Sequence, residues 1–108
     1  MQKEKIIKSS NKYTEVINNK ISVKSRYYSI YYQESDSNKY GITVPKKIGK
    51  SNIRNKIKRR VKNIIITNEK YIQMNFNYVI IIKECILELN YKQMEQELME
   101  LFKKVRKI

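Results

Sequence analysis

The stretch from Ser51 to Thr67, SNIRNKIKRRVKNIIIT, constrains the fold more than any other part of the chain, because as a helix it has two incompatible faces. At about 100° per residue, one side becomes an apolar stripe made of Ile53, Ile57, Val61, Ile64 and Ile65. The opposite side is polar and basic and carries Asn55, Lys58, Arg59 and Lys62, flanked by Arg54, Lys56 and Arg60. Such a helix is stable only when its apolar stripe docks on a larger body. The basic face is therefore predicted to point outward, towards an anionic partner.

The charge of the whole chain points the same way. Its 108 residues predict one domain, 1–108, in which residues 1–8 form a flexible basic lead-in. The chain has 24 Lys and Arg against 10 Asp and Glu, a net charge of +14, and no histidine that could lose charge near neutral pH. No run approaches the roughly 18 apolar residues of a membrane span, and the lone Cys85 fits a reducing compartment. We expect a cytoplasmic protein with no membrane partner and a polyphosphate as its natural counter-surface.

Hydrophobic periodicity predicts six elements in the order helix, strand, strand, helix, strand, helix. They are a short helix from Ser10 over NKYTEVIN, strands at Arg26–Glu34 and Tyr40–Val44, the basic helix with Ser51 as its N-cap, a strand at Tyr78–Glu84 and a helix at Tyr91–Lys107. The first two strands are expected to form an antiparallel hairpin, and the third, apolar throughout, to lie centrally. This order predicts an α+β fold, a two-layer α/β sandwich with helices packed against a small sheet.

Side-chain patterns separate core positions from open ones. In the first strand, alternation assigns Tyr28, Ile30 and Tyr32 to the core, and assigns Tyr27, Ser29, Tyr31 and Gln33 to a face that suits an open groove. In the last helix, Asn90 and Gln93 match a capping box. Its apolar stripe is Tyr91, Met94, Leu98, Leu101, Phe102 and Val105.

The sequence indicates no catalytic residue. Histidine, the commonest general acid or base, is absent, and the carboxylates are scattered or lie on one solvated helix. No cysteine and histidine cluster could hold zinc, and no glycine-rich loop could hold a nucleotide. We therefore predict no catalytic residues, no metal ligands and no organic cofactor in this chain, so that any reaction belongs to its partner.

Binding is the better-supported role. A run of charge on a helix is often only a solvated face, but here the charge has one sign along the whole helix. It also continues into Lys46, Lys47 and Lys50, and an aromatic surface lies on the first strand. A basic track beside aromatic side chains is how proteins hold single-stranded nucleic acid. These features together predict a module that binds RNA or DNA.

At residues 45–63, PKKIGKSNIRNKIKRRVKN, the sequence resembles the protein subunit of bacterial ribonuclease P. That family carries a lysine-lysine-glycine approach to a helix with an arginine-asparagine-arginine motif, followed by Ile-Lys-Arg. The matching positions here are Arg54, Asn55 and Lys56, then Ile57, Lys58 and Arg59, with Lys62 where a further arginine is expected. The resemblance extends from about Ile7 to Tyr31 as well, and the element order covers nearly the whole chain.

The resemblance implies a specific function. Family members join a catalytic RNA that removes the 5′ leader of precursor tRNA, and the RNA with its Mg²⁺ ions performs the hydrolysis, so the protein alone, a monomer, should be inactive. The residues expected to contact the catalytic RNA are Arg54, Asn55, Lys56, Lys58, Arg59, Lys62, Lys46 and Lys47. A cleft between the first helix and the sheet receives the leader, at Tyr13, Ile17 and Tyr31, with Tyr27 added because it shares the face of Tyr31. The family fold also implies a small mixed sheet with a left-handed β-α-β crossover.

Some positions depart from the family pattern. Lys56 and Lys62 replace arginines, which keeps the charge but loses the planar fork that binds phosphate in two places. Asn63 stands where an acid is common, and Ile17 stands where an aromatic is usual, which weakens base stacking on that side of the cleft. The alternative reading is a ribosomal or ribosome-assembly RNA-binding protein without a role in cleavage.

Overall fold

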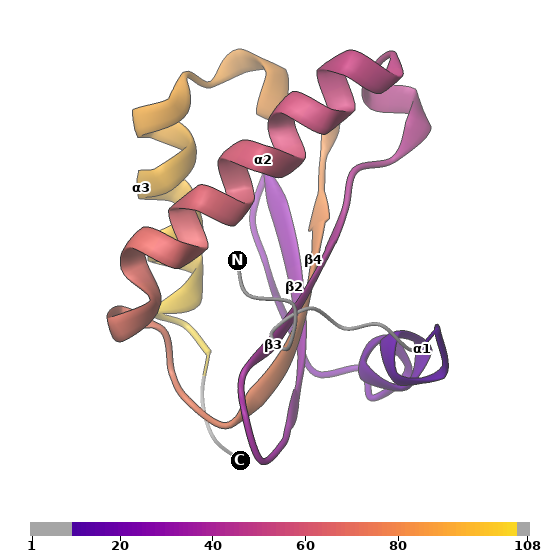
Figure 1. Ribbon diagram of the computed structural model, residues 1–108, viewed down its shortest axis with the longest axis vertical. Coiled ribbons are helices and arrows are strands. Elements are labelled where there is room, and N and C mark those ends of the chain that lie inside the picture. Colours follow the sequence, from indigo (N-terminus) through magenta and orange to yellow (C-terminus); the bar gives the residue numbers. More distant parts are fainter. Residues whose placement is uncertain (1–9, 106–108) are drawn as a thin grey trace.

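The computed structural model describes residues 10–105, so the predicted basic lead-in lies outside the described residues. The elements are α1 (Ser10–Asn18), β1 (Ser22–Lys24), β2 (Tyr28–Glu34), β3 (Lys39–Thr43), α2 (Ser51–Asn68), β4 (Phe76–Ile82) and α3 (Tyr91–Phe102). Figure 1 labels the three helices and the strands β2, β3 and β4. Short 3-10 turns lie at Lys46–Ile48, Glu69–Tyr71 and Glu84–Glu88. This is the predicted α+β order with one additional strand, β1.

The sheet has four strands in the order β1-β2-β4-β3. β4 pairs antiparallel with β2 and parallel with β3, so the central place predicted for the most apolar strand is confirmed. The predicted antiparallel hairpin of β2 and β3 is wrong, because β4 lies between these two strands. A hairpin there would have left β4 at an edge with its apolar side chains and backbone only partly covered. Instead, β3, α2 and β4 form the β-α-β crossover that the resemblance implies.

The strand predicted at Arg26–Glu34 is β2, and it begins only at Tyr28 because a turn precedes it. Ser25 Oγ accepts hydrogen bonds from the backbone N–H groups of Tyr27 and Tyr28, both at 3.2 Å, and the Ser25 N–H donates to the Tyr28 carbonyl at 2.8 Å. This turn joins β1 to β2 and removes Arg26 and Tyr27 from the strand. β1 then pairs antiparallel with β2, with Lys24 opposite Ser29.

The main core lies between one face of the sheet and the helices α2 and α3 (Figure 1). Tyr28, Ile30 and Tyr32 of β2 are buried there, which confirms the predicted core face. The Tyr28 hydroxyl donates to the Met94 carbonyl at 3.0 Å, and the Tyr78 ring meets Phe102 edge-on at 5.3 Å between centroids. The sheet and α3 are thereby joined by both apolar and polar contacts.

The α1 helix lies on the opposite face of the sheet. Val16 is fully buried there, and Gln33 Nε2 donates to Glu15 Oε1 at 3.2 Å. The Tyr13 ring covers Gly41, where a Cβ atom would stand 2.6 Å from Tyr13 Cε2. α1 thus adds a partial third layer to the predicted two-layer sandwich.

The ends of the two long helices differ slightly from the predictions. In α2, Lys50 rather than Ser51 is the N-cap. Ile53 lies in the first turn beside Gly49, before the helix reaches the body of the protein, so it is 40% exposed instead of joining the buried stripe of Ile57, Val61, Ile64 and Ile65. In α3 the capping box of Asn90 and Gln93 is confirmed, but the helix ends at Phe102 and not at Lys107. Among residues 10–105, no helix has the length and apolar character to cross a membrane.

Burial in this core makes the hydroxyls of Tyr28, Tyr40 and Tyr78 harder to ionise. Burial raises the pKa of Tyr40 from its ordinary value of 10.0 to about 12, the hydrogen bond from Asn38 lowers it in part, and nearby Glu69 raises it. Burial also raises the pKa values of Tyr28 and Tyr78. The folded state therefore favours the neutral form of each hydroxyl.

We expect folding stability to fall as the pH rises from about 10 towards 12, and these tyrosines to contribute no pH dependence below about 9. In Tyr40→Phe the fall should be shallower, by up to about 1.4 kcal/mol per pH unit, because one buried group no longer ionises on unfolding. Urea denaturation at several pH values measures the slope. Tyr71→Phe, which removes a hydroxyl from an exposed side chain, is the control, and equal slopes for Tyr40→Phe and the unmodified chain would contradict the prediction.

Candidate nucleic-acid interface

The outer side of α2 is a continuous basic surface. Its exposed polar residues are Asn55, Lys56, Lys58 and Arg59, and Arg54, Arg60 and Lys62 are half-buried beside them. The helix contains no Asp or Glu, so no carboxylate within it offsets this charge. Eighteen residues at 1.5 Å each give a surface about 27 Å long.

The approach to α2 extends this surface. Lys46 and Lys47 are exposed on a 3-10 turn that buried Ile48 fixes to the core. Lys47 Nζ lies 3.7 Å from Glu84 Oε1, but both side chains are exposed, so water and salt screen this pair. Because Lys46 and Lys47 lie just before Ser51, they stand next to the positive N-terminal end of the α2 dipole.

Arg54 has a structural role that the motif did not reveal. Its Nε donates to the Gly49 carbonyl at 3.1 Å, and its Nη2 donates to Ser51 Oγ at 3.2 Å. The guanidinium thus folds back on the helix start and fixes the shape of the approach loop. Part of its donor set is already used, which leaves fewer donors for an RNA phosphate.

Two asparagines fix α2 to α3. Asn63 Nδ2 donates to the Tyr91 hydroxyl at 2.6 Å, and Asn68 Nδ2 donates to the Ile64 carbonyl and to Glu95 Oε2, both at 2.9 Å. Asn63, which stands where the family commonly has an acid, is therefore a docking residue in this chain. These bonds set the orientation of the basic face relative to the rest of the protein.

The second candidate surface is the α1 face of the sheet. Cross-strand pairing aligns side chains in two neighbouring rows on this face, one with Ser22, Tyr31, Val79 and Gly41, the other with Lys24, Ser29, Ile81 and Thr43. α1 covers the Gly41 end of the first row through Tyr13. Tyr31, near the other end, stays half-exposed, which leaves an aromatic ring available beside the helix.

The structure places three of the four residues predicted to bind the leader on one side of the sheet. Tyr13 and Ile17 on α1 and Tyr31 on β2 are all half-buried on this side of the sheet. Tyr27 is not part of the group, because it lies in the β1–β2 turn and packs against the main core. Strand alternation assigned Tyr27 to the wrong face because the strand does not extend to it.

Polar atoms beneath α1 are poorly satisfied. The Tyr13 hydroxyl, Gln33 Oε1 and Asn77 Oδ1 are buried without a hydrogen-bond partner, and Asn77 is only 1% exposed. Burial also raises the pKa of Tyr13. Each such atom costs about 1–3 kcal/mol, so the contact of α1 with the sheet is weaker than its buried area alone suggests.

Lys24 is a candidate contact that sequence reasoning missed. Its Nζ lies 5.6 Å from the centroid of the Tyr31 ring, and the side chain is exposed. The sequence does contain a weak strand signal here, because polar and apolar residues alternate in Ser22-Val23-Lys24, just before the turn-forming Ser25. A three-residue strand is too short for such alternation to stand out.

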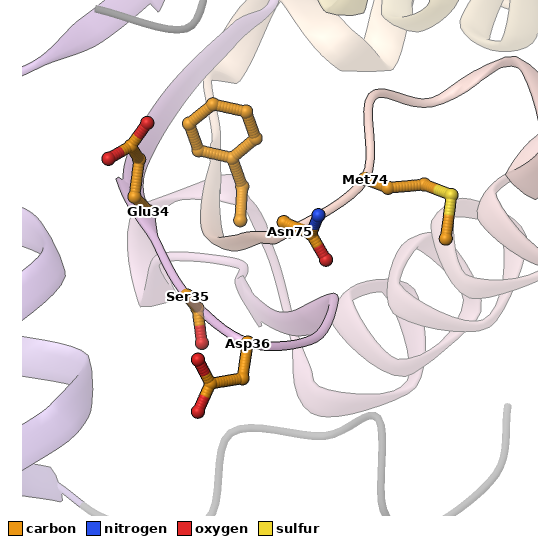
Figure 2. A pocket seen from close by; sticks show the side chains of 6 residues that line it. Glu34, Ser35, Asp36, Met74 and Asn75 are labelled. Carbon is orange, nitrogen blue, oxygen red and sulfur yellow. The ribbon is translucent and has the colours of Figure 1, made fainter.

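An open pocket at the end of β2 has the opposite character. Figure 2 shows its lining residues Glu34, Ser35, Asp36, Met74 and Asn75. Glu34 ends β2 and the others lie in the loops that follow β2 and precede β4, which are joined by a hydrogen bond from the Ser35 N–H to the Asn75 carbonyl at 2.9 Å. Its two carboxylates repel phosphate. Within residues 10–105, no three acidic or cysteine side chains come together in a group that could hold a metal ion.

Comparison with known proteins assigns the family. A family model described as Ribonuclease P matches residues 1–106. The chain belongs to the ribonuclease P protein family. The "Ribonuclease P protein component" of Mycoplasma mycoides subsp. mycoides is 33% identical over 109 residues, covering 98% of this chain and 100% of that protein. The protein of the same name from Mycoplasma capricolum is 34% identical with the same coverage.

Solved structures agree on the fold. The ribonuclease P protein from Thermotoga maritima superposes with a TM-score of 0.87, covering 94% of this chain and 97% of that chain at 22% identity. The Staphylococcus aureus protein gives 0.85, covering 92% and 93% at 24% identity. At these identities the likeness concerns the fold alone. A β3-α2-β4 crossover of the opposite hand would not superpose so well. The chain therefore shares the crossover of these proteins, and the family resemblance gives that crossover as left-handed.

The basic face of α2 leads to a prediction about salt. Arg59→Ala should weaken binding to a transcribed ribonuclease P RNA and lower the slope of log affinity against log salt by about one, because one phosphate contact is lost. Filter binding across a KCl series measures the slope. Arg26→Ala is the matched control, because Arg26 is exposed, lies outside α2 and pairs with Glu88 at 3.5 Å. If Arg59→Ala leaves the slope unchanged, Arg59 lies outside the interface.

Proposed function

We propose that this chain is the protein component of a ribonuclease P ribonucleoprotein, an endoribonuclease that removes the 5′ leader of precursor tRNA. One observation carries the proposal: the basic face of α2 and the aromatic face beside α1 lie on opposite sides of one sheet (Figure 1). Two different RNA segments can therefore be bound at once without competing for the same side chains.

The α2 side suits the catalytic RNA. Lys58 and Arg59 are exposed along a helix with no acidic residue, and Lys46 and Lys47 continue the charge around its N-terminus. Cations held at fixed positions displace counterions from a folded RNA, and the entropy of counterion release drives binding. Lys56 and Lys62 act there as point charges, because lysine lacks the two-pronged geometry of arginine.

The α1 side suits a single-stranded leader. The half-exposed Tyr31 ring offers a stacking surface that tolerates any base, and half-buried Tyr13 and Ile17 lie on α1, which covers the same face of the sheet. Lys24, 5.6 Å from the centre of that ring, supplies a positive charge for the phosphate of a stacked nucleotide. Sequence-tolerant stacking with one nearby cation is appropriate for leaders that differ between tRNA precursors.

Hydrolysis is assigned to the RNA subunit and its Mg²⁺ ions. We assign this chain no step that passes through the metal. Its own part is to position the leader and to reduce repulsion between two polyanions. We place this role in the cytoplasm, with the protein alone monomeric and inactive.

Reconstitution tests the proposal. The purified chain, mixed with a bacterial ribonuclease P RNA and a precursor tRNA at low Mg²⁺, should enhance cleavage, because protein cations replace the charge screening that high Mg²⁺ otherwise supplies. The protein without RNA should cleave nothing. A variant with Lys58→Gln and Arg59→Gln together should lose the enhancement at low Mg²⁺ and recover it at high Mg²⁺. Absence of enhancement by the unmodified chain would refute the proposal.

A second experiment tests the leader surface. Tyr31→Ala should weaken affinity for leader-containing tRNA by about 1–3 kcal/mol, since a stacked base loses its platform. Tyr31→Phe, which keeps the ring, should bind like the unmodified chain. The measurement compares precursor with mature tRNA on the reconstituted particle, and an equal loss for both substrates would mean that the substitution damages the fold instead.

A further inference from the structure

The loop between α2 and β4 exposes two large apolar side chains that neither candidate surface uses. Tyr71 is 68% exposed and Met74 is 73% exposed, the highest values among the exposed large hydrophobic residues of the described chain. Single apolar side chains on a protein surface are ordinary, so the exposure of these two gains meaning only from the groups around them.

The loop that carries them is held firmly. Ile72, between the two, is 3% exposed and anchors the loop in the core. The Gln73 carbonyl accepts hydrogen bonds from the Tyr78 hydroxyl at 2.6 Å and from Asn38 Nδ2 at 3.2 Å, and Asn38 Oδ1 accepts from the Phe76 N–H at 3.0 Å. The backbone beside Tyr71 is therefore fixed by the fold, and little backbone entropy would be lost when a partner binds there.

The ring is paired with a cation. Lys70 Nζ lies 5.1 Å from the centroid of the Tyr71 ring. The pair offers an aromatic face for stacking beside a positive charge for a phosphate. Tyr31 and Lys24 make the same combination at 5.6 Å on the α1 side of the sheet.

The loop also continues the basic line of α2. Asn55, Arg59, Lys62 and Ile66 follow one another at spacings of four, three and four residues, so they lie along one side of the helix within about 60° of each other. Ile66, at the end of this line, is 48% exposed, and Lys70 and Tyr71 follow in the 3-10 turn that closes the helix. An RNA that lies along α2 meets this turn as it leaves the helix.

The acidic pocket limits the surface on its other side. Met74 lines that pocket together with Glu34 and Asp36, and the two carboxylates are unfavourable to phosphate (Figure 2). The contact is thereby confined to Lys70 and Tyr71, on the side that continues α2. The net charge of +14 favours RNA over a protein as the partner.

We propose that Tyr71 stacks on an unpaired nucleobase of the catalytic RNA, with Lys70 neutralising a neighbouring phosphate. The inference rests on the proposed function and extends it, because it adds a base-stacking contact at the far end of α2 to the phosphate contacts along the helix.

Three variants test this contact against a transcribed ribonuclease P RNA in filter binding over a KCl series. Tyr71→Ala should weaken affinity roughly 5- to 150-fold with an unchanged salt slope, since stacking releases no counterion. Tyr71→Phe should retain affinity, and Lys70→Gln should lower the slope by about one. Urea denaturation of each variant should match that of the unmodified chain, because both side chains are exposed.

Three other outcomes of these measurements would each overturn the stacking contact. If the unmodified chain binds ribonuclease P RNA tightly and Tyr71→Ala binds equally well, the stacking contact is refuted while the proposed function stands. If Tyr71→Ala keeps RNA affinity but loses self-association in sedimentation, the loop contacts a second copy of the chain and the RNA contact is wrong. If the unmodified chain prefers ribonuclease P RNA no more than an unrelated RNA of equal length, both proposals fail.

Discussion

The docking of α2 on the core is the interaction on which the rest of the structure depends. Like charges three and four residues apart repel one another along this helix, and its basic face offers nothing apolar in return. Ile57, Val61, Ile64 and Ile65 reverse the balance, because each fully buried aliphatic side chain contributes about 1.5–3 kcal/mol. The same docking fixes the direction of the basic face, so the stability of the fold and the presentation of charge have one cause.

The central strand makes this arrangement two-sided. β4 is apolar on both faces, so it requires cover from α2 and α3 on one side and from α1 on the other. The cover by α1 is partial and leaves polar atoms unpaired near Tyr13, whereas the cover by α2 and α3 is tight and well bonded. This difference in packing is compatible with the proposed roles, in which the α2 side holds a structured RNA and the α1 side receives variable leaders.

Elements with strong local signals could be predicted from the sequence, and pairings between distant segments could not. The periodicity of α2, the capping box of α3 and the apolar run of β4 are local, and each was confirmed in the main. The exceptions are Ile53, which is exposed at the start of α2, and the bounds of β4, which are Phe76–Ile82 instead of Tyr78–Glu84. The hairpin of β2 and β3 was wrong because strand order depends on burying β4, which comes later in the chain. On the site, Tyr13 and Ile17 came from the resemblance, and Tyr31 came from both strand alternation and the resemblance. Lys24 and the role of Arg54 required the register of β1 and the shape of the approach loop.

The most direct test of the central claim, that the outer face of α2 docks a catalytic RNA, is the identity of the RNA crosslinked to the chain in its own cell. Crosslinked RNA should be sequenced for the unmodified chain and for a variant carrying Lys58→Gln and Arg59→Gln. The structure predicts that ribonuclease P RNA is the most enriched species and that the variant loses this enrichment. Enrichment of ribosomal RNA instead, or ribonuclease P RNA retained equally by the variant, would contradict the claim.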